Sequence, residues 1–485
     1  MKKILLLLVA AIAALPLYAA VEVVTKGTGK TYSFKTLSTI ENSGVSAVNG
    51  EYVVANNITI SEGDNFKLDD NAVIRLCDGV TVRLEGGISM ELEEGSMVTR
   101  NAETDVPKGF ILASNLPDTI VCSNLSMEYA SLKCVIESHL YVHDCSFKFS
   151  NGALSGGGAL TLGTTGSSYT VENCEFISNT VPAIGCAANF VVGTSITGCN
   201  FEDNNSDNTN KPQVNLVVGG DKDLVVRDCI FLGARRTKVG GIGISNFANI
   251  SGTNNVYIEN NTIKYHRFGI GLTYGAMNVF VKNNQIIENK YEEDPMMGGS
   301  GISAQDMTEL MALYCEGNTI EDHFWGVTLI GCKTANLGKV DDPNAPDYNP
   351  GNNVFKNNGN NNIPYDLFNN GPYTVYAQGN IWGVDEQTAE KIETVISHKV
   401  DDPKLGEVIF MPAGTGGVEK VAADHLVFDS ASKQLSGAEG LVEVYTVSGQ
   451  LAARAIPVCG TADLSDLNAG VYVVKAGGKV LKIVL

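Results

Sequence analysis

Three basic residues recur at one position of a repeating pattern in the middle of the chain. Each follows a Cys or Asn by six residues, and they are Arg235, Arg267 and Lys290. On a chain with a formal net charge of −20, such a set can hold an anionic ligand through charge-assisted hydrogen bonds. A cation beside a carboxylate also makes a neighbouring C–H more acidic, which helps a base to remove that proton.

Further polar side chains accompany these cations. Arg236, Lys238 and His266 lie beside them in sequence, and His323 takes the place of His266 one or two repeats later. The predicted substrate-binding edge comprises Arg235, Arg236, Lys238, His266, Arg267 and Lys290. The opposing interpretation is a solvated turn edge whose cations pair with Glu259, Glu288 or Glu292, since surface ion pairs are common and weakly constrained.

The residue six positions before each cation belongs to a longer series of anchors. An anchor is a Cys or Asn followed two residues later by a large apolar side chain. The pairs are Cys145–Phe147, Cys174–Phe176, Cys199–Phe201, Cys229–Phe231, Asn261–Ile263, Asn284–Ile286, Asn318–Ile320, Asn353–Phe355 and Asn380–Trp382. Their spacing of 23 to 35 residues, with β-rich runs and Asn or Gly turns between them, predicts a solenoid of stacked turns.

The repeats resemble those of right-handed parallel β-helix proteins, whose coils read approximately V-x-I-x-N-N-x-I-x-x-N-x-x-G-I-x-L. The stretch IENNTIKYHRFGIGL (258–272) follows this pattern, and the resemblance extends over about residues 50–412. The expected fold is all-β. A right-handed parallel β-helix over 21–412, with 27–45 as its N-terminal cap, is expected to precede a linker at 413–420 and a small Ig-like β-sandwich over 421–485.

Both the end of the solenoid and the tail carry further resemblances. The segment 377–412, with Asn380, Trp382 and Gly383, resembles the closing segment of secreted bacterial β-helix proteins, so Trp382 is expected in a structural cap. The tail resembles the C-terminal sorting domain of type IX secretion cargo. The matching residues are Val444, Tyr445, Gly449, Gln450, Leu464, Leu467, Ala469, Gly470, Val471, Tyr472, Val474 and Lys475. This resemblance implies recognition by the type IX secretion machinery, whereas the alternative is an ordinary sandwich module; Cys459 has no place in the pattern.

The N-terminus predicts export. Residues 1–20, MKKILLLLVAAIAALPLYAA, combine two lysines, an apolar run and small residues at the end, which is typical of a Sec signal peptide. No later apolar run approaches the ~20 residues of a membrane helix. We therefore expect a monomer without a membrane span, located at the outer-membrane surface of a Gram-negative cell or outside it. The acidic charge balance argues against nucleic acid as a partner.

Metal and cofactor chemistry finds little support. The 11 cysteines are an odd number, and neither a CxxC pair nor a Cys/His cluster occurs, so we expect no zinc and no cofactor. The four anchor cysteines are predicted to form a buried column rather than a thiolate site. Calcium stays an option at the loop acids Asp341, Asp342 and Asp347, although they lack the spacing of a recognised calcium loop.

Two functions remain open. β-Helix polysaccharide lyases use a groove in which a cation or Ca²⁺ neutralises a uronate carboxylate while Lys, Arg, His or Tyr takes the C5 proton. Polygalacturonase-like hydrolases carry N-T-D, D-D, G-H-G and R-I-K motifs, and only D-D pairs occur here, in loops and the closing segment. A scaffold without a recognised catalytic set favours non-catalytic binding of glycans or surfaces. The alternative is a polysaccharide lyase or another carbohydrate-active enzyme acting on uronate-containing glycans.

Two long insertions offer a second place for a site. Residues 291–300 and 332–353 interrupt otherwise short coils. Loops on a rigid scaffold often carry binding residues. Evolutionary drift at a turn that tolerates inserted residues explains the same insertions equally well.

Overall fold

The computed structural model describes residues 21–154, 156–163, 168–186, 190–247 and 252–414, and most strand residues between 426 and 484. The predicted signal peptide, residues 415–420 of the predicted linker, and the tail residues Gly449, Gln450, Cys459 and Ala469 lie outside the described residues. The chain divides between residues 415 and 416 into two compact units, each of which is described by itself.

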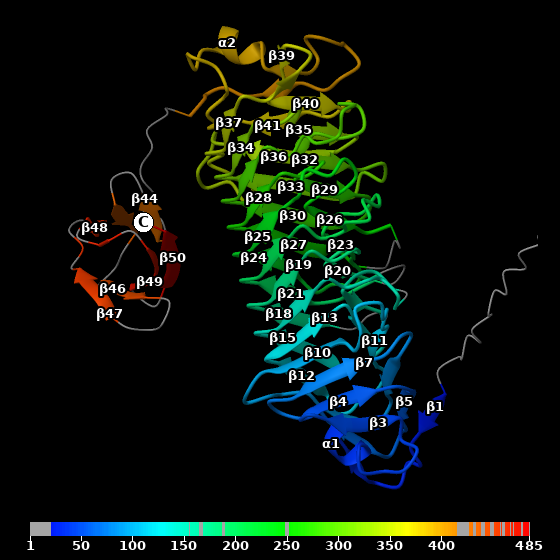
Figure 1. Cartoon of the computed structure of the whole chain (residues 1–485). Coiled ribbons are helices and arrows are strands. Elements are labelled where there is room, and N and C mark those ends of the chain that lie inside the picture. Colours follow the sequence, from blue (N-terminus) through cyan, green and yellow to red (C-terminus); the bar gives the residue numbers. More distant parts are fainter. Residues whose placement is uncertain are drawn as a thin grey trace, which may run out of the picture. The chain divides into compact units, whose positions relative to one another are not determined.

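Three long, mostly parallel sheets build the first unit, and its coils follow one another from the blue to the yellow end of the colour scale (Figure 1). Numbered as in the next paragraph, sheet 3, then sheet 2, then sheet 1 receives one strand from each coil between residues 119 and 370. The strand of every coil pairs in parallel with the equivalent strand of the next coil, as in Val226↔Ile258, Phe231↔Ile263 and Ile244↔Leu272. This arrangement is a right-handed parallel β-helix, and the predicted fold class is therefore confirmed.

The strands of the three sheets are as follows. Sheet 1 contains β1 (Glu22–Val24), β5 (Asn57–Ile60), β8 (Thr81–Leu84), β11 (Gly109–Leu112), β14 (Ser131–Cys134), β17 (Leu160–Leu162), β20 (Ile184–Gly185), β23 (Val214–Val217), β26 (Ile242–Ser245), β29 (Ile270–Thr273), β32 (Ser300–Gln305), β35 (Trp325–Ile330), β40 (Leu367–Asn370) and β42 (Ile396–Ser397). Sheet 2 contains β3 (Val45–Val48), β4 (Glu51–Val54), β7 (Val73–Leu76), β10 (Ser96–Arg100), β13 (Leu125–Glu128), β16 (Ser146–Lys148), β19 (Glu175–Ile177), β22 (Asn200–Glu202), β25 (Ile230–Leu232), β28 (Thr262–Lys264), β31 (Gln285–Ile287), β34 (Thr319–Glu321) and β37 (Val354–Lys356). Sheet 3 contains β12 (Thr119–Ser123), β15 (His139–His143), β18 (Tyr169–Glu172), β21 (Thr194–Thr197), β24 (Leu224–Arg227), β27 (Asn254–Glu259), β30 (Met277–Lys282), β33 (Met311–Glu316), β36 (Thr334–Gly338), β41 (Val375–Ala377) and β43 (Val408–Ile409).

Two sharp corners recur in most coils because one residue at each corner has a left-handed backbone; in the Cys229 coil the left-handed residue of the second corner is Arg235 (φ 58°). The first corner is the residue before the anchor, as at Asn260 (φ 56°) and Asn283 (φ 55°). The second is the fourth residue after the anchor, as at Tyr265 (φ 70°) and Glu288 (φ 54°). Asn is among the residues that adopt this conformation most readily. Between the corners, side chains alternate between the interior and the surface, as strand geometry requires.

The anchors form one buried column inside the coils. Asn261, Asn284, Asn318, Asn353 and Asn380 are linked in series, each amide nitrogen donating to the next side-chain oxygen at 2.8–3.0 Å. The anchor cysteines continue this column, and they are buried free thiols, which confirms the interior position predicted for them. The residues two positions later also stack, with ring centroids 4.4–5.1 Å apart through the phenylalanine stack Phe147, Phe176, Phe201 and Phe231.

Short elements close both ends of the solenoid. At the N-terminal end, helix α1 (Phe34–Leu37) inserts Phe34 against Phe66, with ring centroids 5.5 Å apart, beside the small sheet of β2 (Thr31–Tyr32), β6 (Asn65–Lys67) and β9 (Gly87–Ser89). The C-terminal end carries the β38 (Gly359–Asn360) and β39 (Ile363–Pro364) hairpin and helix α2 (Ala389–Glu393). Trp382 is only 1% exposed and stacks on Phe355 at 4.9 Å, so its predicted structural place is confirmed.

The second unit consists of two antiparallel sheets. One contains β44 (Val427–Asp429), β45 (Gln434–Ser436) and β48 (Thr461–Asp463); the other contains β47 (Leu451–Ala455), β46 (Val442–Thr446), β49 (Val471–Ala476) and β50 (Lys479–Val484). Leu435 and Ala462 of the first sheet share one core with Val444 and Val474 of the second. Two sheets that bury a common core form a small β-sandwich. Across the described part of the whole chain, both helices are far too short to cross a membrane.

Candidate functional site

The predicted basic edge lies at the second corner of successive coils, and its cations are already engaged by the protein. Arg235 donates from Nε to the Tyr291 hydroxyl at 2.6 Å and lies over the Tyr265 ring, 4.2 Å from its centroid. Its Nη2 is 3.7 Å from a carboxylate oxygen of Glu288. The Arg235 side chain is nevertheless 54% exposed, so one part of it still faces solvent.

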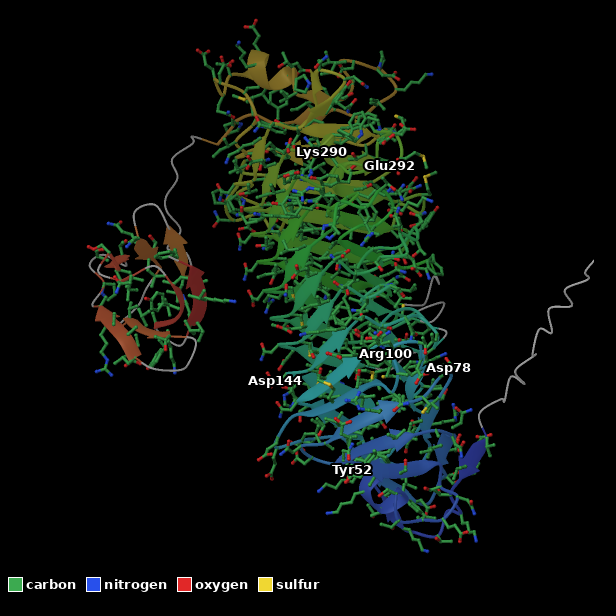
Figure 2. All side chains as sticks on the ribbon, in the orientation of Figure 1. Tyr52, Asp78, Arg100, Asp144, Lys290 and Glu292 are labelled. Atoms are coloured by element: carbon green, nitrogen blue, oxygen red, sulfur yellow. The ribbon has the colours of Figure 1, made fainter. Side chains whose placement is uncertain are left out.

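Two further cations of this edge bind acids of their own. Arg236 donates to Asp203 at 2.6 Å, and Lys290 forms an ion pair with Asp322. Lys238 is exposed, and its backbone N–H donates to the side chain of Asn208 at 3.0 Å. Lys290 and Glu292, both labelled in Figure 2, stand two positions apart in the sequence and have different ionic neighbours, Asp322 and Arg267. These pairs agree with the interpretation of a solvated turn edge for most of the cations.

His266 lies inside the coil. Its ring contacts Gln213 Nε2 through Nε2 at 2.7 Å and Asn289 Oδ1 through Nδ1 at 3.0 Å. His323 is equally buried, accepting the Asn289 N–H at Nδ1 and contacting the Ile286 carbonyl through Nε2. Burial lowers the pKa of both rings to about 4, so both are neutral near pH 7. Neither ring is available to a ligand on the surface.

These histidines belong to a continuous buried polar column that sequence reasoning missed. Each member hydrogen-bonds the next; the members are Ser131, Ser150, Asn179, Asn204, Gln213, His266, Asn289, His323, Asn358 and Asp366. The column ends at Asp366, which accepts the Gly383 N–H at 2.7 Å. Burial raises the pKa of Asp366 to about 6. Most of its members stand five residues after an anchor, directly behind the second corner.

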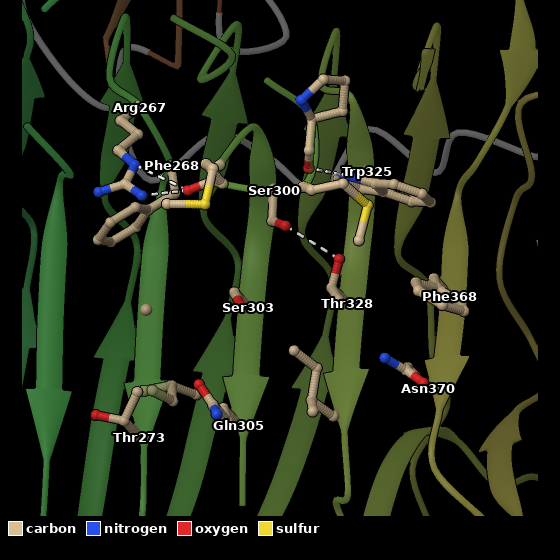
Figure 3. A pocket seen from close by; sticks show the side chains of 17 residues that line it. Arg267, Phe268, Thr273, Ser300, Ser303, Gln305, Trp325, Thr328, Phe368 and Asn370 are labelled. Atoms are coloured by element: carbon tan, nitrogen blue, oxygen red, sulfur yellow. Dashed lines mark hydrogen bonds between the residues drawn. The ribbon is translucent and has the colours of Figure 1, made fainter. Parts of the chain in front are cut away.

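A cavity of about 320 Å³ opens on the outer face of sheet 1 (Figure 3). Its floor is formed by β29, β32, β35 and β40, so four coils contribute to it. The register aligns Ser303, Thr328 and Phe368 in one row and Gln305, Ile330 and Asn370 in a second row. The insertion at 291–300 supplies one wall of the cavity through Pro295, Met296 and Met297.

Aromatic rings line both ends of the cavity. Trp325 stacks on Phe368 with centroids 5.2 Å apart, and its Nε1–H donates to the Pro295 carbonyl at 2.8 Å. Phe268 covers Gly271 at the other end, where a Cβ would lie 2.8 Å from its ring. Glycine at this position thus leaves room for the aromatic side chain.

Neutral polar groups occupy the floor between the rings. Ser300 and Thr328 share a hydroxyl–hydroxyl contact of 3.0 Å. Polar side chains that make no hydrogen bond to other described residues face the same space (Figure 3): Thr273, Ser303, Gln305 and Asn370. They provide hydroxyl and amide donors and acceptors for a ligand.

Arg267 is the one ionisable side chain among the 17 described residues that line the cavity. Its Nε donates to the Met297 carbonyl at 3.0 Å. Nη2 donates to the same carbonyl, and Nη1 donates to the side chain of Asn210. The Glu292 carboxylate is 3.8 Å from Nε, and the Arg267 side chain is 11% exposed. Arg267 therefore holds the wall of the cavity. These 17 described lining residues include no carboxyl, imidazole, thiol, phenol or lysine that could act as an acid or base.

The second insertion does not gather a metal site. Asp341 accepts from Gln378 at 2.9 Å, Asp342 accepts from the Asn344 backbone, and Asp347 pairs with Lys339 at 2.6 Å. Within the described residues, no three His, Cys, Asp or Glu side chains converge in a way that could hold a metal ion.

A sequence signal for the cavity lay one residue from the predicted edge. Phe268 and Trp325 each stand seven residues after an anchor, at Asn261 and Asn318. The cations six residues after the anchors stay at the corner, whereas the next residue begins the approach to sheet 1. Of the six predicted site residues, the cavity lining includes only Arg267.

Comparison with family models finds a β-helix match in the first unit. Residues 134–320 match the model of the family described as right handed beta helix region. The crystal structure of the periplasmic alginate epimerase AlgG is similar with a TM-score of 0.45 and 13% identity, covering 79% of this chain and 83% of that chain. Two mutants of that epimerase give TM-scores of 0.40 and 0.39 at 13% and 12% identity, with the same coverage. No curated protein matches the chain in sequence. The matched coils and the observed sheets define a right-handed β-helix protein.

Proposed function

We propose that this chain is an exported protein that binds a glycan, without catalysis, in the cavity on sheet 1. The observation that carries the proposal is that Trp325 and Phe368 share one open cavity with hydroxyl and amide groups that make no hydrogen bond to other described residues. A sugar presents apolar C–H faces and many hydroxyls, so its site needs aromatic surface and neutral donors and acceptors together.

The lining chemistry supports binding rather than turnover. Glycoside hydrolysis usually needs two carboxyl groups about 5 to 9.5 Å apart, and proton abstraction needs a base within hydrogen-bond reach. The described residues that line the cavity offer neither. A ligand held there meets aromatic surface and hydrogen bonds and no reacting group.

Export is part of the same proposal. The signal-peptide pattern at 1–20 and the sorting-domain resemblance of the tail support passage to the outer-membrane surface or the medium of a Gram-negative cell, through the type IX secretion machinery. Deleting 421–485 tests this directly. The shortened chain should then stay in the periplasm, and its normal appearance outside the cell would contradict the sorting role.

A polysaccharide lyase at the basic edge is the second candidate, because Arg235 contacts the Tyr291 hydroxyl there. A Tyr base needs a lowered pKa, whereas burial and the Glu288 carboxylate raise the pKa of Tyr291. Incubation with uronate polysaccharides, with and without calcium, should give no absorbance from an unsaturated product. A signal that disappears in Arg235→Ala would favour the lyase instead.

Tryptophan fluorescence tests the binding proposal. The chain has two tryptophans, and Trp382 is buried, so Trp382→Phe leaves Trp325 as the reporter in the cavity. A glycan panel titrated into this variant should change the emission for at least one ligand. Trp325→Ala should weaken binding of that ligand at least tenfold by calorimetry. Phe280→Ala, an outward ring on sheet 3, is the matched control and should bind normally. Unchanged binding by Trp325→Ala would overturn the assignment of the cavity.

A further inference from the structure

We infer that the cavity selects neutral saccharides and discriminates against uronate-containing ones; this inference rests on the proposed function and specifies its ligand class. It follows from three features: the hydrogen bonds of Arg267, which is the one cation among the described lining residues; the acids that directly precede the wall on its loop; and the neutral character of the lining side chains that make no hydrogen bond to other described residues.

The guanidinium of Arg267 already donates hydrogen bonds to other groups of the protein. The Arg267 guanidinium donates to the Met297 carbonyl and to the Asn210 side chain, with the Glu292 carboxylate 3.8 Å away. A uronate carboxylate is best recognised by two free, parallel N–H groups of an arginine. Arg267 is only 11% exposed, so binding a carboxylate would require the loop contacts to break first.

Three acidic residues precede the wall of the cavity on the same loop. The loop residues Glu292, Glu293 and Asp294 directly precede Pro295, Met296 and Met297, which form the wall. Glu293 and Asp294 are exposed, and Asp294 accepts the Met296 N–H at 2.9 Å, which keeps its carboxylate on this loop. An anionic sugar approaching this wall is repelled by like charges, most strongly at low ionic strength.

The unpaired groups suit uncharged hydroxyls. Thr273, Ser303, Gln305 and Asn370 offer neutral donors and acceptors, and no second cation lines the cavity in the described part of the chain. A carboxylate moved from water into this space would lose hydration without gaining an ionic partner, which is costly. For a hydroxymethyl group in the place of the carboxylate, the loss of hydration costs far less free energy, because the available amides and hydroxyls can replace its hydrogen bonds with water.

The test compares matched oligosaccharides that differ only in one group. Oligouronates and their carboxyl-reduced counterparts share linkage and length, but the reduced forms carry a neutral hydroxymethyl group. We expect at least one reduced oligosaccharide to bind at least tenfold more tightly than its uronate parent at low salt, and the gap to narrow as salt is added. Equal or tighter binding of the uronate would overturn the inference while leaving glycan binding intact.

Variants of the loop test whether its negative charge, rather than the shape of the cavity, weakens the binding of uronates. Glu293→Gln should strengthen uronate binding and leave the binding of the neutral ligand unchanged, because Glu293 is exposed on the loop and does not line the cavity. Glu321→Gln, on sheet 2, is the matched control and should change neither affinity. If the loop variant changes neither affinity, the charge argument is wrong. If neither reduced nor parent oligosaccharides bind in any pair, and the wider panel also fails, the proposed function itself fails.

Discussion

Trp325 donates a hydrogen bond from Nε1 to the Pro295 carbonyl at 2.8 Å, and this bond ties the loop 291–299 to the floor of the cavity. Arg267 holds the same loop through the Met297 carbonyl. Two side chains from different coils therefore fix one wall, and the cavity depends on both.

The first prediction concerns this wall. Trp325→Phe keeps an aromatic ring but removes the N–H donor, so the loop should open more often while the cavity keeps its apolar surface. Cleavage by a Glu-specific protease at Glu292 or Glu293 should become several-fold faster than in the wild type. Phe280→Ala provides the control, and an unchanged cleavage rate in Trp325→Phe would show that the bond does not hold the loop.

The asparagine column should be sensitive to truncation. Asn318 donates to the Val281 carbonyl and to Asn353, and its Oδ1 accepts from the backbone and side chain of Asn284. Asn318→Ala leaves several of these buried groups unpaired, so the free energy of unfolding should fall by about 2–5 kcal/mol.

Urea denaturation followed by circular dichroism measures this change. Asn255→Ala, which removes an exposed contact with Asp223, should cost only about 0.5 kcal/mol or less. Equal effects of the two variants would mean that the column adds no particular stability.

The buried histidines predict an acid-sensitive fold. Their pKa is lowered by burial to about 4, from an ordinary value of 6.5. The unfolded chain therefore binds protons below pH 6.5 while the folded chain does not, and stability present above pH 6.5 is lost as the pH falls toward 4. Each ring contributes up to about 1.4 kcal/mol per pH unit across this window.

His323→Asn should reduce the dependence of folding stability on pH. Asn occupies the equivalent place at Asn289 and Asn358, so the neighbouring backbone groups can keep hydrogen bonds with it. Asp366 acts in the opposite direction, because its raised pKa of about 6 favours the protonated folded state as the pH falls toward 3.8. Denaturation midpoints measured between pH 4 and 7 give the slope of stability against pH. A slope as steep in His323→Asn as in the wild type would disprove the role of the ring.

Truncation within the phenylalanine stack should cause a large, local loss of stability. Phe201 lies between Phe176 and Phe231, with centroid distances of 5.1 and 4.4 Å, and is fully buried. Phe201→Ala should destabilise the coils by about 3–5 kcal/mol, because the cavity left behind cannot close against a stacked backbone. Hydrogen exchange should increase most in β22 and its neighbours β19 and β25, and a uniform small change over all coils would contradict local stacking.

Much of the fold followed from residues read in order. The anchors at Asn261, Asn284 and Asn318 revealed the period, and Trp382 marked the final coil. These inferences held because a stacked coil places equivalent residues in one column, where only certain side chains fit. The chemistry of His266 could not be read in this way, since the left-handed residue Tyr265 turns the next side chain inward.

The sequence by itself determined the β-helix, its buried anchor column and its capped end, because these depend on local periodicity and on corners of one or two residues. Only the tertiary structure decided where a ligand can bind. Arg267, Trp325 and Phe368 come from three coils separated by loops of unequal length, so their meeting depends on strand register across sheet 1. Register is set by how strands pair between coils and not by distance along the chain.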